Sequence, residues 1–436
     1  MESSDPASAG WRVHKFGGTS LADPERIRHV AGLLDARTPP LAVVVSAMSG
    51  VTDRLLALAE KAHTDANGLS DRLQSLRNDQ RAVVTNLLNG DAAASVLRAL
   101  DRDVDDLTDV LRATRLMGTA PETTRDLVAG YGELWSARVL GGVLRDRGLP
   151  AAVCDAREVL VVTHEDLGPV VDWPATRERF ADWRAEHDNP EVVVVTGFIA
   201  TTPNDVPTTL GRNGSDHSAA LFASLLEAEA LTIWTDTDGV MSADPRYVPD
   251  AQTLDTLTYE EAMELAYFGA RVIHPRTMAP AIDHEIPITI RNTFAPEEPG
   301  TQIHLESNGE PSVVKGFSTV DNVALLNLEG TGMIGVPGIA RRLFDALEDE
   351  NISVILISQG SSEHSICFAV PQEQAEAARA ATEQAFYAEM DRGQIERVEI
   401  TSDCSILAVI GDRMSGTPGV AATFFGALGD AGVNVR

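Results

Sequence analysis

The sequence predicts an α/β fold: an open, mainly parallel sheet with helices on both faces, followed by a smaller repeated unit. Three observations predict it. Short apolar runs bounded by turn residues recur along the chain, as expected of parallel strands buried on both faces of a sheet. Helical patterns separate these runs. Near the C-terminus one segment is repeated, which indicates two copies of a second structural unit.

Strands are expected at five apolar runs. These runs are Val13–Phe16, Leu41–Ala47, Glu191–Thr196, Leu231–Thr235 and Ile286–Arg291. Asp23 and Pro24 predict a helix soon after the first strand, because Asp is a favoured N-cap and Pro fits the first helical turn. The positive end of that helix would face whatever the preceding loop binds. Residues 53–117 are almost wholly helical in pattern and indicate a helical excursion from the sheet.

Composition excludes several classes of function. The 436 residues, 44% of them hydrophobic, are enough for two or three domains with buried cores. The net charge of −30 repels nucleic acid and anionic membranes, so neither is expected as a partner. The first ten residues lack a secretory signal, and no run of about 18 apolar residues could span a bilayer, so we expect a cytoplasmic protein.

Lysine is rare in this chain. Lys15, Lys61 and Lys315 are the only lysines, so the other 35 − 3 = 32 basic residues are arginines. This bias indicates a salt-adapted or GC-rich source. Where arginine replaces lysine almost everywhere, the lysine at position 15 indicates chemistry that a planar guanidinium cannot perform. The alternative is that lysine was retained at position 15 by chance.

Two glycine-rich segments predict a phosphate site. Residues 15–20 are Lys-Phe-Gly-Gly-Thr-Ser after the first strand, and residues 211–216 are Gly-Arg-Asn-Gly-Ser-Asp. Glycines let backbone N–H groups approach phosphate oxygens, Thr19 and Ser20 add hydroxyl donors, and Lys15 supplies a compact charge. The pattern is not a Walker loop, since the lysine precedes the glycines. An ordinary strand-to-helix turn is the alternative.

The segments that carry these groups follow predicted strands. Residues 17–20, 46–53, 197–198 and 235–239 each come directly after one. In an open parallel sheet the carboxyl ends of the strands share one edge. We therefore expect segments that are remote in sequence to converge there.

Charged residues favour an amino acid as the phosphate acceptor. Arg212 can clamp a carboxylate with Ser215 beside it, and Glu133 is a candidate for the ammonium. Asp216 can position Lys15 or a bound magnesium. The alternatives are an exposed helix residue for Glu133 and a turn or N-cap for Asp216. An acceptor carboxylate that is already ionised needs no general base.

Two further segments raise the question of a nucleotide. Residues 235–239 and 244–246 offer carboxylates for ribose hydroxyls and an arginine for phosphate, although a plain Asx turn explains the Asp-Gly part equally well. Residues 330–335 spell Gly-x-Gly-x-x-Gly, the fingerprint of a dinucleotide site. The second copy of the repeat lacks the middle glycine, and Ser358-Gln359 stand where a ribose-binding acid belongs, which argues against that site.

The repeat has a constant offset. Residues 338–347 match residues 419–428, at an offset of 419 − 338 = 81 residues. The match extends from a preceding strand, 323–328 against 404–409, to a following one, 352–354 against 433–435. Each copy is therefore expected to be a strand, a glycine turn, a helix and a strand.

A linker is expected between the two architectures. Pro, Gly and Glu are frequent in residues 297–311. The second copy of the repeat stops at Arg436, the counterpart of Ile355 in the first copy. The second copy is therefore expected to be incomplete in this chain.

These motifs together resemble an aspartokinase of the amino-acid kinase superfamily. The resemblance rests on residues 15–20, 46–53, 133, 211–216, 234–239, 244–246 and 267–275. The repeat resembles the paired, ferredoxin-like ACT domains of the same enzymes, and the match is closest to the bifunctional aspartokinase–homoserine dehydrogenases. It implies a kinase domain at 12–305, a first ACT domain at 312–400 and part of a second at 401–436.

The resemblance implies that ATP, with Mg²⁺, phosphorylates the β-carboxylate of L-aspartate to 4-phospho-L-aspartate, on the route to lysine, threonine and methionine. Carried over by position, Lys15 and Asp216 are catalytic, and no residues are assigned to a metal site. Aspartate is expected at Thr52, Glu133, Arg212 and Ser215, and the nucleotide at Gly17, Gly18, Ser20, Thr235, Asp236, Arg246 and Arg271.

Some positions depart from the family pattern. Met241 stands where tyrosine is common and Arg271 replaces a lysine, so altered nucleotide affinity is expected and not lost activity. Ile355 occupies a position where lysine-sensing relatives carry an acid, which favours threonine over lysine as feedback effector. Ser353 and Gln359 are candidate effector contacts. Because ACT domains pair across subunits in the family, a homo-oligomer, dimer or tetramer, is expected.

Two rival hypotheses stay open. In the first, the chain is an amino-acid-sensing or assembly module whose kinase part does not turn over. In the second, the fold is kept but the acceptor is glutamate, N-acetylglutamate, carbamate or a nucleotide.

Overall fold

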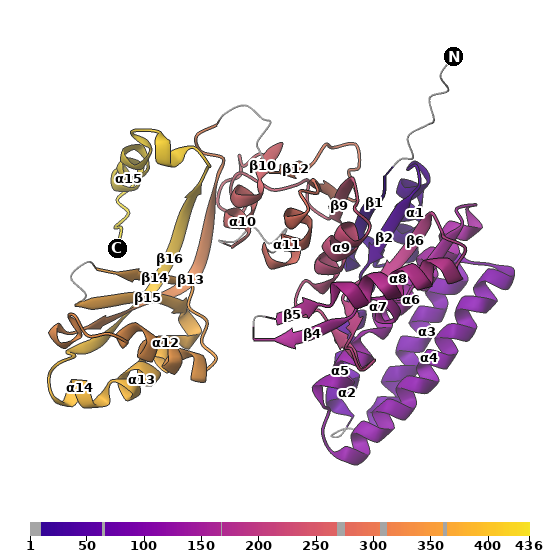
Figure 1. Cartoon of the computed structure of the whole chain (residues 1–436), viewed down its shortest axis with the longest axis horizontal. Coiled ribbons are helices and arrows are strands. Elements are labelled where there is room, and N and C mark those ends of the chain that lie inside the picture. The colour runs from indigo at the N-terminus through magenta and orange to yellow at the C-terminus, as the bar shows by residue number, and fades with distance from the viewer. Residues whose placement is uncertain (1–9, 63–65, 167, 268–274, 306–311, 361–363) are drawn as a thin grey trace. The chain divides into compact units, whose positions relative to one another are not determined.

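The computed structural model describes residues 10–62, 66–166, 168–267, 275–305, 312–360 and 364–436. It divides into two compact units. The first unit comprises residues up to 315 together with residues 411–436, and the second comprises residues 316–410. Each unit has its own sheet (Figure 1).

The first unit is built on an eight-stranded sheet with the order β10-β12-β11-β9-β1-β2-β6-β3. Its strands are β1 Arg12–Phe16, β2 Leu41–Val45, β3 Ala151–Cys154, β6 Val192–Thr196, β9 Ala230–Thr235, β10 Thr256–Thr258, β11 Ile288–Asn292 and β12 Thr301–His304. All neighbours pair in parallel except β11 with β12, which are antiparallel. All five predicted strands are present, and the open, mainly parallel sheet confirms the predicted fold class.

The register of the central strands fixes where their carboxyl ends lie. Phe16 of β1 is level with Val45 of β2 and with Trp234 of β9, and Val45 is level with Thr196 of β6. The four strands therefore end in one row. Strand β6, four valines followed by Thr196, is completely buried, as expected of a strand covered on both faces.

Helices follow most strands of the first unit. They are α1 Pro24–Asp35, α2 Val51–Lys61, α3 Ala66–Leu87, α4 Gly90–Met117, α5 Glu122–Ala129, α6 Tyr131–Asp146, α7 Ala156–Val159, α8 Trp173–Glu186, α9 Gly214–Leu225, α10 Tyr259–Tyr267 and α11 Pro275–Asp283. Helix α6 contacts β2, β3 and β6, whereas α9 contacts β1, β2 and β9. Two small hairpins, β4 Val162–Glu165 with β5 Gly168–Val171 and β7 Ile199–Thr201 with β8 Pro207–Thr209, complete the unit.

The local signals for helices are confirmed. Asp23 caps α1, its side chain accepting a hydrogen bond from the backbone N–H of Arg26 at 2.9 Å. Helices α2, α3 and α4 occupy the predicted helical excursion, and α3 packs along α4 as two long neighbouring helices (Figure 1). A short 3₁₀ turn, Gly18–Leu21, separates β1 from α1.

The linker expected at residues 297–311 is partly wrong. Residues 301–304 form β12, which pairs with both β10 and β11. Local composition favours a loop here, but the long-range pairing with β10 and β11 makes the segment a strand. Residues 306–311 lie outside the described part of the chain.

The second unit is a four-stranded antiparallel sheet, ordered β14-β15-β13-β16. Its elements are β13 Gly316–Glu329, α12 Ile339–Asp349, β14 Leu356–Gln359, β15 Ser365–Pro371, α13 Ala375–Ala385, α14 Tyr387–Asp391 and β16 Arg397–Ile410, with short 3₁₀ turns at Thr331–Met333 and Gln372–Gln374. Apolar side chains of the helices and sheet form one core, among them Leu326, Leu343 and Phe368.

The predicted repeat is visible in the elements. Helix α15, Val420–Asp430, begins 420 − 339 = 81 residues after α12 and ends 430 − 349 = 81 residues after it. Each helix follows a glycine in the left-handed region, Gly338 with φ 91° and Gly419 with φ 92°. The strand expected at 352–354 is wrong, because sheet pairing begins only at β14. Residue 401, the expected start of the second ACT domain, lies within the continuous strand β16.

The glycines of the dinucleotide-like pattern have a packing reason. A Cβ on Gly330 would lie 2.4 Å from the backbone oxygen of Gln394, and one on Gly332 would lie 2.8 Å from the same atom. The chain at residues 330–332 therefore needs glycine to pass Gln394, and no nucleotide is required to explain the pattern.

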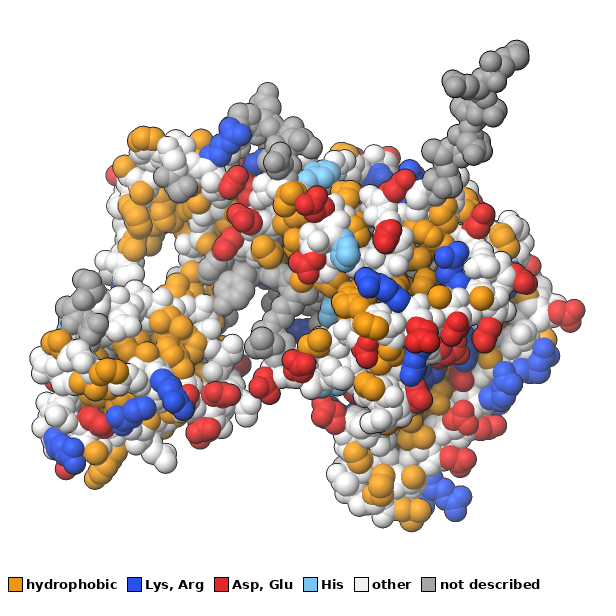
Figure 2. All heavy atoms as spheres, viewed as in Figure 1, with side chains coloured by type: hydrophobic (Ala, Val, Ile, Leu, Met, Phe, Trp, Pro, Cys, Tyr) orange, Lys and Arg blue, Asp and Glu red, His pale blue; other side chains and the backbone are white. Residues whose placement is uncertain are grey.

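The surface carries the acidic excess of the sequence. Figure 2 shows Asp and Glu side chains spread over the visible face, with Lys and Arg side chains between them. Within the described residues, no helix combines the length and apolar character needed to cross a membrane.

Candidate functional site

One cavity at the carboxyl-terminal edge of the eight-stranded sheet gathers several of the predicted segments. Its volume is about 350 Å³. Its lining residues are Lys15, Gly17, Gly18, Ser46, Ala47, Thr52, Glu133, Phe198 and all six residues from Gly211 to Asp216. We call it the sheet-edge cavity. It brings together segments that follow β1, β2 and β6 and segments at the beginnings of α6 and α9.

Glycines allow these segments to approach closely. A Cβ on Gly18 would lie 2.8 Å from the carbonyl oxygen of Ala47, and a Cβ on Gly197 would lie 2.8 Å from the side chain of Ser215. Backbone hydrogen bonds join the loops as well, because the N–H of Ser49 donates to the oxygen of Gly18 at 3.2 Å. The strand ends and the start of α9 therefore form one continuous wall.

Lys15 and Asp216 form the charged centre of the cavity. The Lys15 ammonium lies 2.6 Å from the Asp216 carboxylate, and both side chains are largely but not fully buried, at 12% and 16% exposed. Lys15 comes from β1 and Asp216 from the first turn of α9. Asp216 is thus more than an N-cap or a turn residue: it fixes the position of the lysine.

Three helix N-termini contribute to the cavity. Thr52, Glu133 and Ser215 lie in the first turns of α2, α6 and α9. Unpaired N–H groups and the helix dipoles make such ends favourable for anions. No residue of α1 lines the cavity, and the orientation of the positive end of α1 toward a ligand stays a prediction. The 3₁₀ turn at Gly18–Leu21 comes between β1 and α1.

The loop before α9 presents an arginine to the cavity. Gly211 has φ 74° and Asn213 has φ 58°, both in the left-handed region, so the chain turns sharply before the helix. Arg212 between them is exposed and lines the cavity. Within the described residues its guanidinium makes no hydrogen bond or ion pair, so it is available to a carboxylate or phosphate.

Glu133 is the opposite case, a carboxylate held inside the protein. It is 3% exposed, so the alternative of an exposed helix residue is wrong. One carboxylate oxygen, Oε1, accepts a hydrogen bond from the backbone N–H of Ala47 at 3.2 Å, and Oε2 has no partner in the described part of the chain. Burial raises the pKa of Glu133 to about 8, against the weaker effect of the Ala47 N–H. A bound cation would satisfy this group.

Of the expected nucleotide residues, Gly17 and Gly18 line the sheet-edge cavity, and the others that the structure describes do not. Ser20 does not line the sheet-edge cavity: it is fully buried and its hydroxyl shares a 2.7 Å hydrogen bond with the hydroxyl of Thr293. The N–H of Thr293 donates to the oxygen of Thr235 at 2.8 Å. Sequence reasoning missed Thr293, although its place directly after β11 is the same signal that marked the other loops.

Thr235, Asp236 and Arg246 do not line the cavity either. The Thr235 hydroxyl contacts the Asp236 carboxylate at 3.3 Å, directly after β9. Arg246 is exposed and pairs with Asp244. Arg271 lies outside the described residues, as does most of the 267–275 motif. Met241 is half-buried, and its sulfur accepts a hydrogen bond from Thr253 at 3.5 Å.

The second unit has a cavity of its own, with a volume of about 300 Å³. Gln359 lines it, together with the turn before α12 that includes Gly335 and Gly338. Ser353, the other expected effector contact, is exposed and does not line this cavity.

The arrangement at the sheet edge suits a small ligand with both signs of charge next to a phosphate. Lys15, Arg212 and three helix ends favour anionic groups, and Glu133 favours a cation. Such a set matches an α-amino acid with its carboxylates and ammonium.

Comparison with known proteins gives the family. Residues 10–292 match the amino acid kinase family, and residues 326–386 and 407–436 match an ACT domain. The chain is 45% identical over 439 residues to bifunctional aspartokinase/homoserine dehydrogenase 1, chloroplastic, of Arabidopsis thaliana. That match covers 99% of this chain and 48% of the relative, so the chain spans about half the length of this bifunctional protein.

A second relative is similar over most of its own length. Lysine-sensitive aspartokinase 3 of Escherichia coli is 31% identical over 417 residues, which is 95% of this chain and 90% of that protein. The crystal structure of E. coli aspartokinase III in complex with aspartate and ADP has a TM-score of 0.79 and 29% identity, covering 98% of this chain and 92% of that one. The chain therefore belongs to the amino acid kinase family, and within it to the aspartokinases that carry ACT domains.

Proposed function

We propose that this protein is an aspartate kinase that transfers the terminal phosphoryl group of ATP to the β-carboxylate of L-aspartate. The observation that carries the proposal is the sheet-edge cavity, where Lys15, Arg212 and Glu133 line one space of about 350 Å³. The cavity offers a cation for phosphate and groups of both signs for an amino acid. An aspartokinase of the same family was solved with aspartate and ADP.

In this proposal aspartate is held by groups of complementary charge. The guanidinium of Arg212 pairs with a carboxylate of aspartate, and the hydroxyls of Thr52 and Ser215 donate to carboxylate oxygens. The ammonium of aspartate lies against Glu133, whose Oε2 has no partner in the described residues. Pairing of a buried carboxylate with a cation stabilises its charged form.

The phosphoryl group is transferred beside Lys15. The β-carboxylate of aspartate is ionised at neutral pH, so its oxygen attacks the γ-phosphorus without a base, and ADP leaves with the bridging oxygen. The Lys15 ammonium, held by Asp216, follows the phosphoryl charge, and the N–H groups near Gly17 and Gly18 contribute hydrogen bonds.

Magnesium fits this site only together with the nucleotide. Within the described residues, no group of three or more His, Cys, Asp or Glu side chains could hold a metal ion. Mg²⁺ is usually held by one or two carboxylates and by substrate phosphates. Asp216 is the carboxylate that lines the cavity beside Lys15, and its hard oxygen donors suit the ion. When bound, Mg²⁺ would neutralise phosphate charge.

The remaining nucleotide contacts are proposed at Thr235, Asp236, Arg246 and Arg271. Thr235 is the last residue of β9 and Asp236 follows it, and β9 pairs with the Lys15 strand, which supports a nucleotide that extends from the cavity toward β9. Ser20 is proposed to act on the nucleotide only indirectly, because its hydroxyl is already hydrogen-bonded to the hydroxyl of Thr293. Ser20 thereby ties the phosphate loop to the carboxyl end of β11.

Regulation is proposed for the second unit, through an amino acid bound at its ACT fold. Gln359 lines a cavity there, and Ser353 remains a candidate contact. The E. coli relative is named lysine-sensitive, whereas Ile355 in this chain is apolar, which supports threonine over lysine as the effector. A dimer or tetramer stays a prediction. A cytoplasmic location also stays a prediction, since the Arabidopsis relative is named chloroplastic.

The test is a trapping assay in buffers of increasing salt. The enzyme is incubated with ATP, Mg²⁺, hydroxylamine and one acceptor, and hydroxamate is measured by its iron complex. We expect hydroxamate with L-aspartate and far less with glutamate or N-acetylglutamate. A preference for another acceptor would support the changed-acceptor hypothesis, and no hydroxamate with any acceptor at any salt concentration would support the sensing module.

A further inference from the structure

We propose that Asp103 is a positioning residue for aspartate binding: it holds helix α6 so that Glu133 stays aimed into the sheet-edge cavity. The proposal rests on the proposed function, in which Glu133 binds the ammonium of aspartate. Asp103 belongs to α4, in the helical excursion, and does not line the cavity.

The side-chain hydrogen bonds of Asp103 both go to one helix. Asp103 is buried, with 7% of its surface exposed. Its Oδ2 accepts a 2.9 Å hydrogen bond from the indole N–H of Trp135 and a second hydrogen bond from the guanidinium of Arg138. Trp135 and Arg138 both belong to α6, as Glu133 does. In the described residues, neither of these two side chains has another hydrogen-bond partner.

The geometry of α6 places Asp103 and the cavity on different sides of this helix. At about 100° per residue, Trp135 lies roughly 200° and Arg138 roughly 140° around the helix from Glu133. Glu133 is hydrogen-bonded to Ala47 on the cavity side. Gly132 packs against the same residue, because a Cβ on Gly132 would lie 2.7 Å from the Ala47 side chain. Helix α6 is therefore held from both sides.

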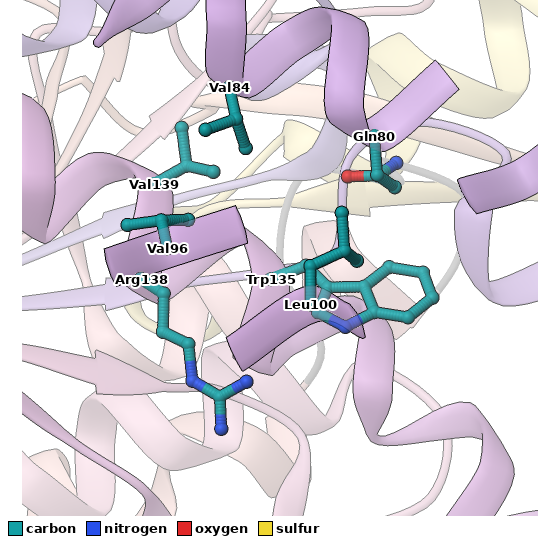
Figure 3. Close-up of a pocket in the computed structure, with 7 residues that line it drawn as sticks. All are labelled: Gln80, Val84, Val96, Leu100, Trp135, Arg138 and Val139. Atoms are coloured by element: carbon teal, nitrogen blue, oxygen red, sulfur yellow. The ribbon is translucent and has the colours of Figure 1, made fainter. Parts of the chain in front are cut away.

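The helices around Trp135 are closely packed. Figure 3 shows Trp135, Arg138 and Val139 around a small space that is closed by side chains of α3 and α4. The volume of this space is about 10 Å³, roughly one water molecule. Gln80 and Leu100 border it. Trp135 lies in the second turn of α6, two residues after Glu133.

The charges around the network are balanced by more than one pair. Burial raises the pKa of Asp103, and Arg138 opposes that shift, as does Arg157 from farther away. Arg157 is itself paired with Asp155. Tyr131, at the start of α6, has its pKa raised to about 12 by burial and by nearby Asp106 and Asp103. On the cavity side, Lys15, Arg212 and Asp216 line the same space as Glu133.

The experiment compares Asp103→Asn with a matched control. Asparagine can still accept from Trp135 but loses the charge that Arg138 pairs with. We expect the KM for L-aspartate to rise about fivefold or more, with the KM for ATP within about twofold, because an error of about 1 Å in a binding group is costly. Trp135→Phe, which removes only one donor, tests the same network if Asp103→Asn folds poorly, and a rise in the KM for aspartate of about threefold or more is expected.

Asp101→Asn is the control. Asp101 lies two positions before Asp103 on α4 and binds two arginines, Arg77 and Arg81, which belong to α3. Asp101→Asn therefore removes a similar ion pair without removing any contact to α6. We expect its KM for aspartate to stay within about twofold of the wild-type value.

A double-mutant cycle shows whether Asp103 acts through Glu133. If it does, Asp103→Asn added to Glu133→Gln changes the aspartate KM far less than it does alone, since the group to be positioned is gone. Independent, multiplying effects of the two substitutions, or an aspartate KM unchanged in both Asp103→Asn and Trp135→Phe, would overturn the proposal. The wild-type enzyme serves as the separate check of function: if it forms no aspartyl hydroxamate, the proposed function fails first.

Discussion

Lys15 is held at the wall of the sheet-edge cavity by Asp216, 2.6 Å away, and both groups remain partly exposed. An ammonium that is paired yet accessible can turn to a phosphate without losing its position. Gly17 is adjacent to this group: a Cβ there would lie 3.5 Å from the Lys15 nitrogen, an ordinary contact distance. The position of the Lys15 charge, which is aimed at the phosphoryl group, therefore depends on the Asp216 side chain.

The first prediction concerns this lysine. Lys15→Ala lowers kcat by about 100-fold or more, in line with losing a charge directed at the transferring phosphate. Lys61→Ala, which removes another of the three lysines from the end of α2, leaves kcat within about twofold. Both are measured by hydroxamate formation at saturating substrates. Near-normal turnover in Lys15→Ala would remove this residue from the mechanism.

The second prediction concerns the proton on Glu133. Because burial raises its pKa to about 8, the carboxyl is mostly protonated at pH 7 in the free enzyme. An ammonium binds the ionised form, so aspartate binding at pH 7 releases close to one proton, and affinity rises as the pH rises toward 8. Calorimetry in two buffers of different ionisation enthalpy measures this release. In Glu133→Gln we expect none, and equal release in both proteins would contradict the assignment.

The chemistry of single residues could be predicted from the sequence where a residue follows a strand. Lys15, Arg212 and Asp216 were recognisable because charged side chains stand beside glycines at such points, and all line one cavity. The direction of a hydroxyl could not be predicted. Ser20 lies on a 3₁₀ turn, and only the position of Thr293, remote in sequence, determines that its hydroxyl is buried.

At the scale of elements, helix α6 determines the position of Glu133, because glycines let this helix lie close to the sheet. A Cβ on Gly132 would lie 2.7 Å from Ala47, and one on Gly141 would lie 2.5 Å from Val153. Each contact leaves no room for a methyl group. The distances of α6 from the loop after β2 and from β3 are therefore set by glycine, and with them the depth of Glu133.

The third prediction tests this spacing. Gly132→Ala pushes α6 away from Ala47, lowers the free energy of unfolding by about 1 to 3 kcal/mol and raises the KM for aspartate. Gly32→Ala on α1 is the control, since its Cβ would meet only the end of Arg147 at 3.9 Å. We expect the control to be neutral or slightly stabilising, as Ala is in helices. Chemical denaturation and steady-state kinetics measure both, and equal effects in the two variants would contradict the account.

Elements with strong local signals could be predicted, and those that depend on pairing could not. The capped helix α1 and the apolar strand β6 are where their sequences indicate. Strand β12 lies in a segment rich in Pro and Gly, and it is a strand because β10 and β11 pair with it. Ile352 and Val354 are apolar, yet hydrogen bonding to β15 begins only at Ile355 and the strand β14 only at Leu356.

On the scale of the whole molecule, charge is the dominant feature. The net charge of −30 comes from 65 acidic against 35 basic residues, and the acidic side chains are spread over the face in Figure 2. Like charges repel in the compact state more than in the expanded one. Salt shortens the range of that repulsion to about 3 Å at 1 M.

The fourth prediction follows from this repulsion. Raising KCl from about 0.1 M to 2 M increases Tm by several degrees or more, since screening removes a cost of the folded state. Differential scanning calorimetry measures the shift. Sucrose at equal osmolality is the control for general exclusion effects. A Tm that falls or stays constant with KCl would show that favourable ion pairs outweigh the repulsion.

The central claim is that distant loops of one sheet edge hold ATP and aspartate in a single cavity. A crystal structure with a non-hydrolysable ATP analogue and L-aspartate tests it most directly. We expect the terminal phosphate beside Lys15, and aspartate between Arg212 and Glu133 with its β-carboxylate pointing at that phosphate. Aspartate bound elsewhere, or a phosphate far from Lys15, would contradict the account.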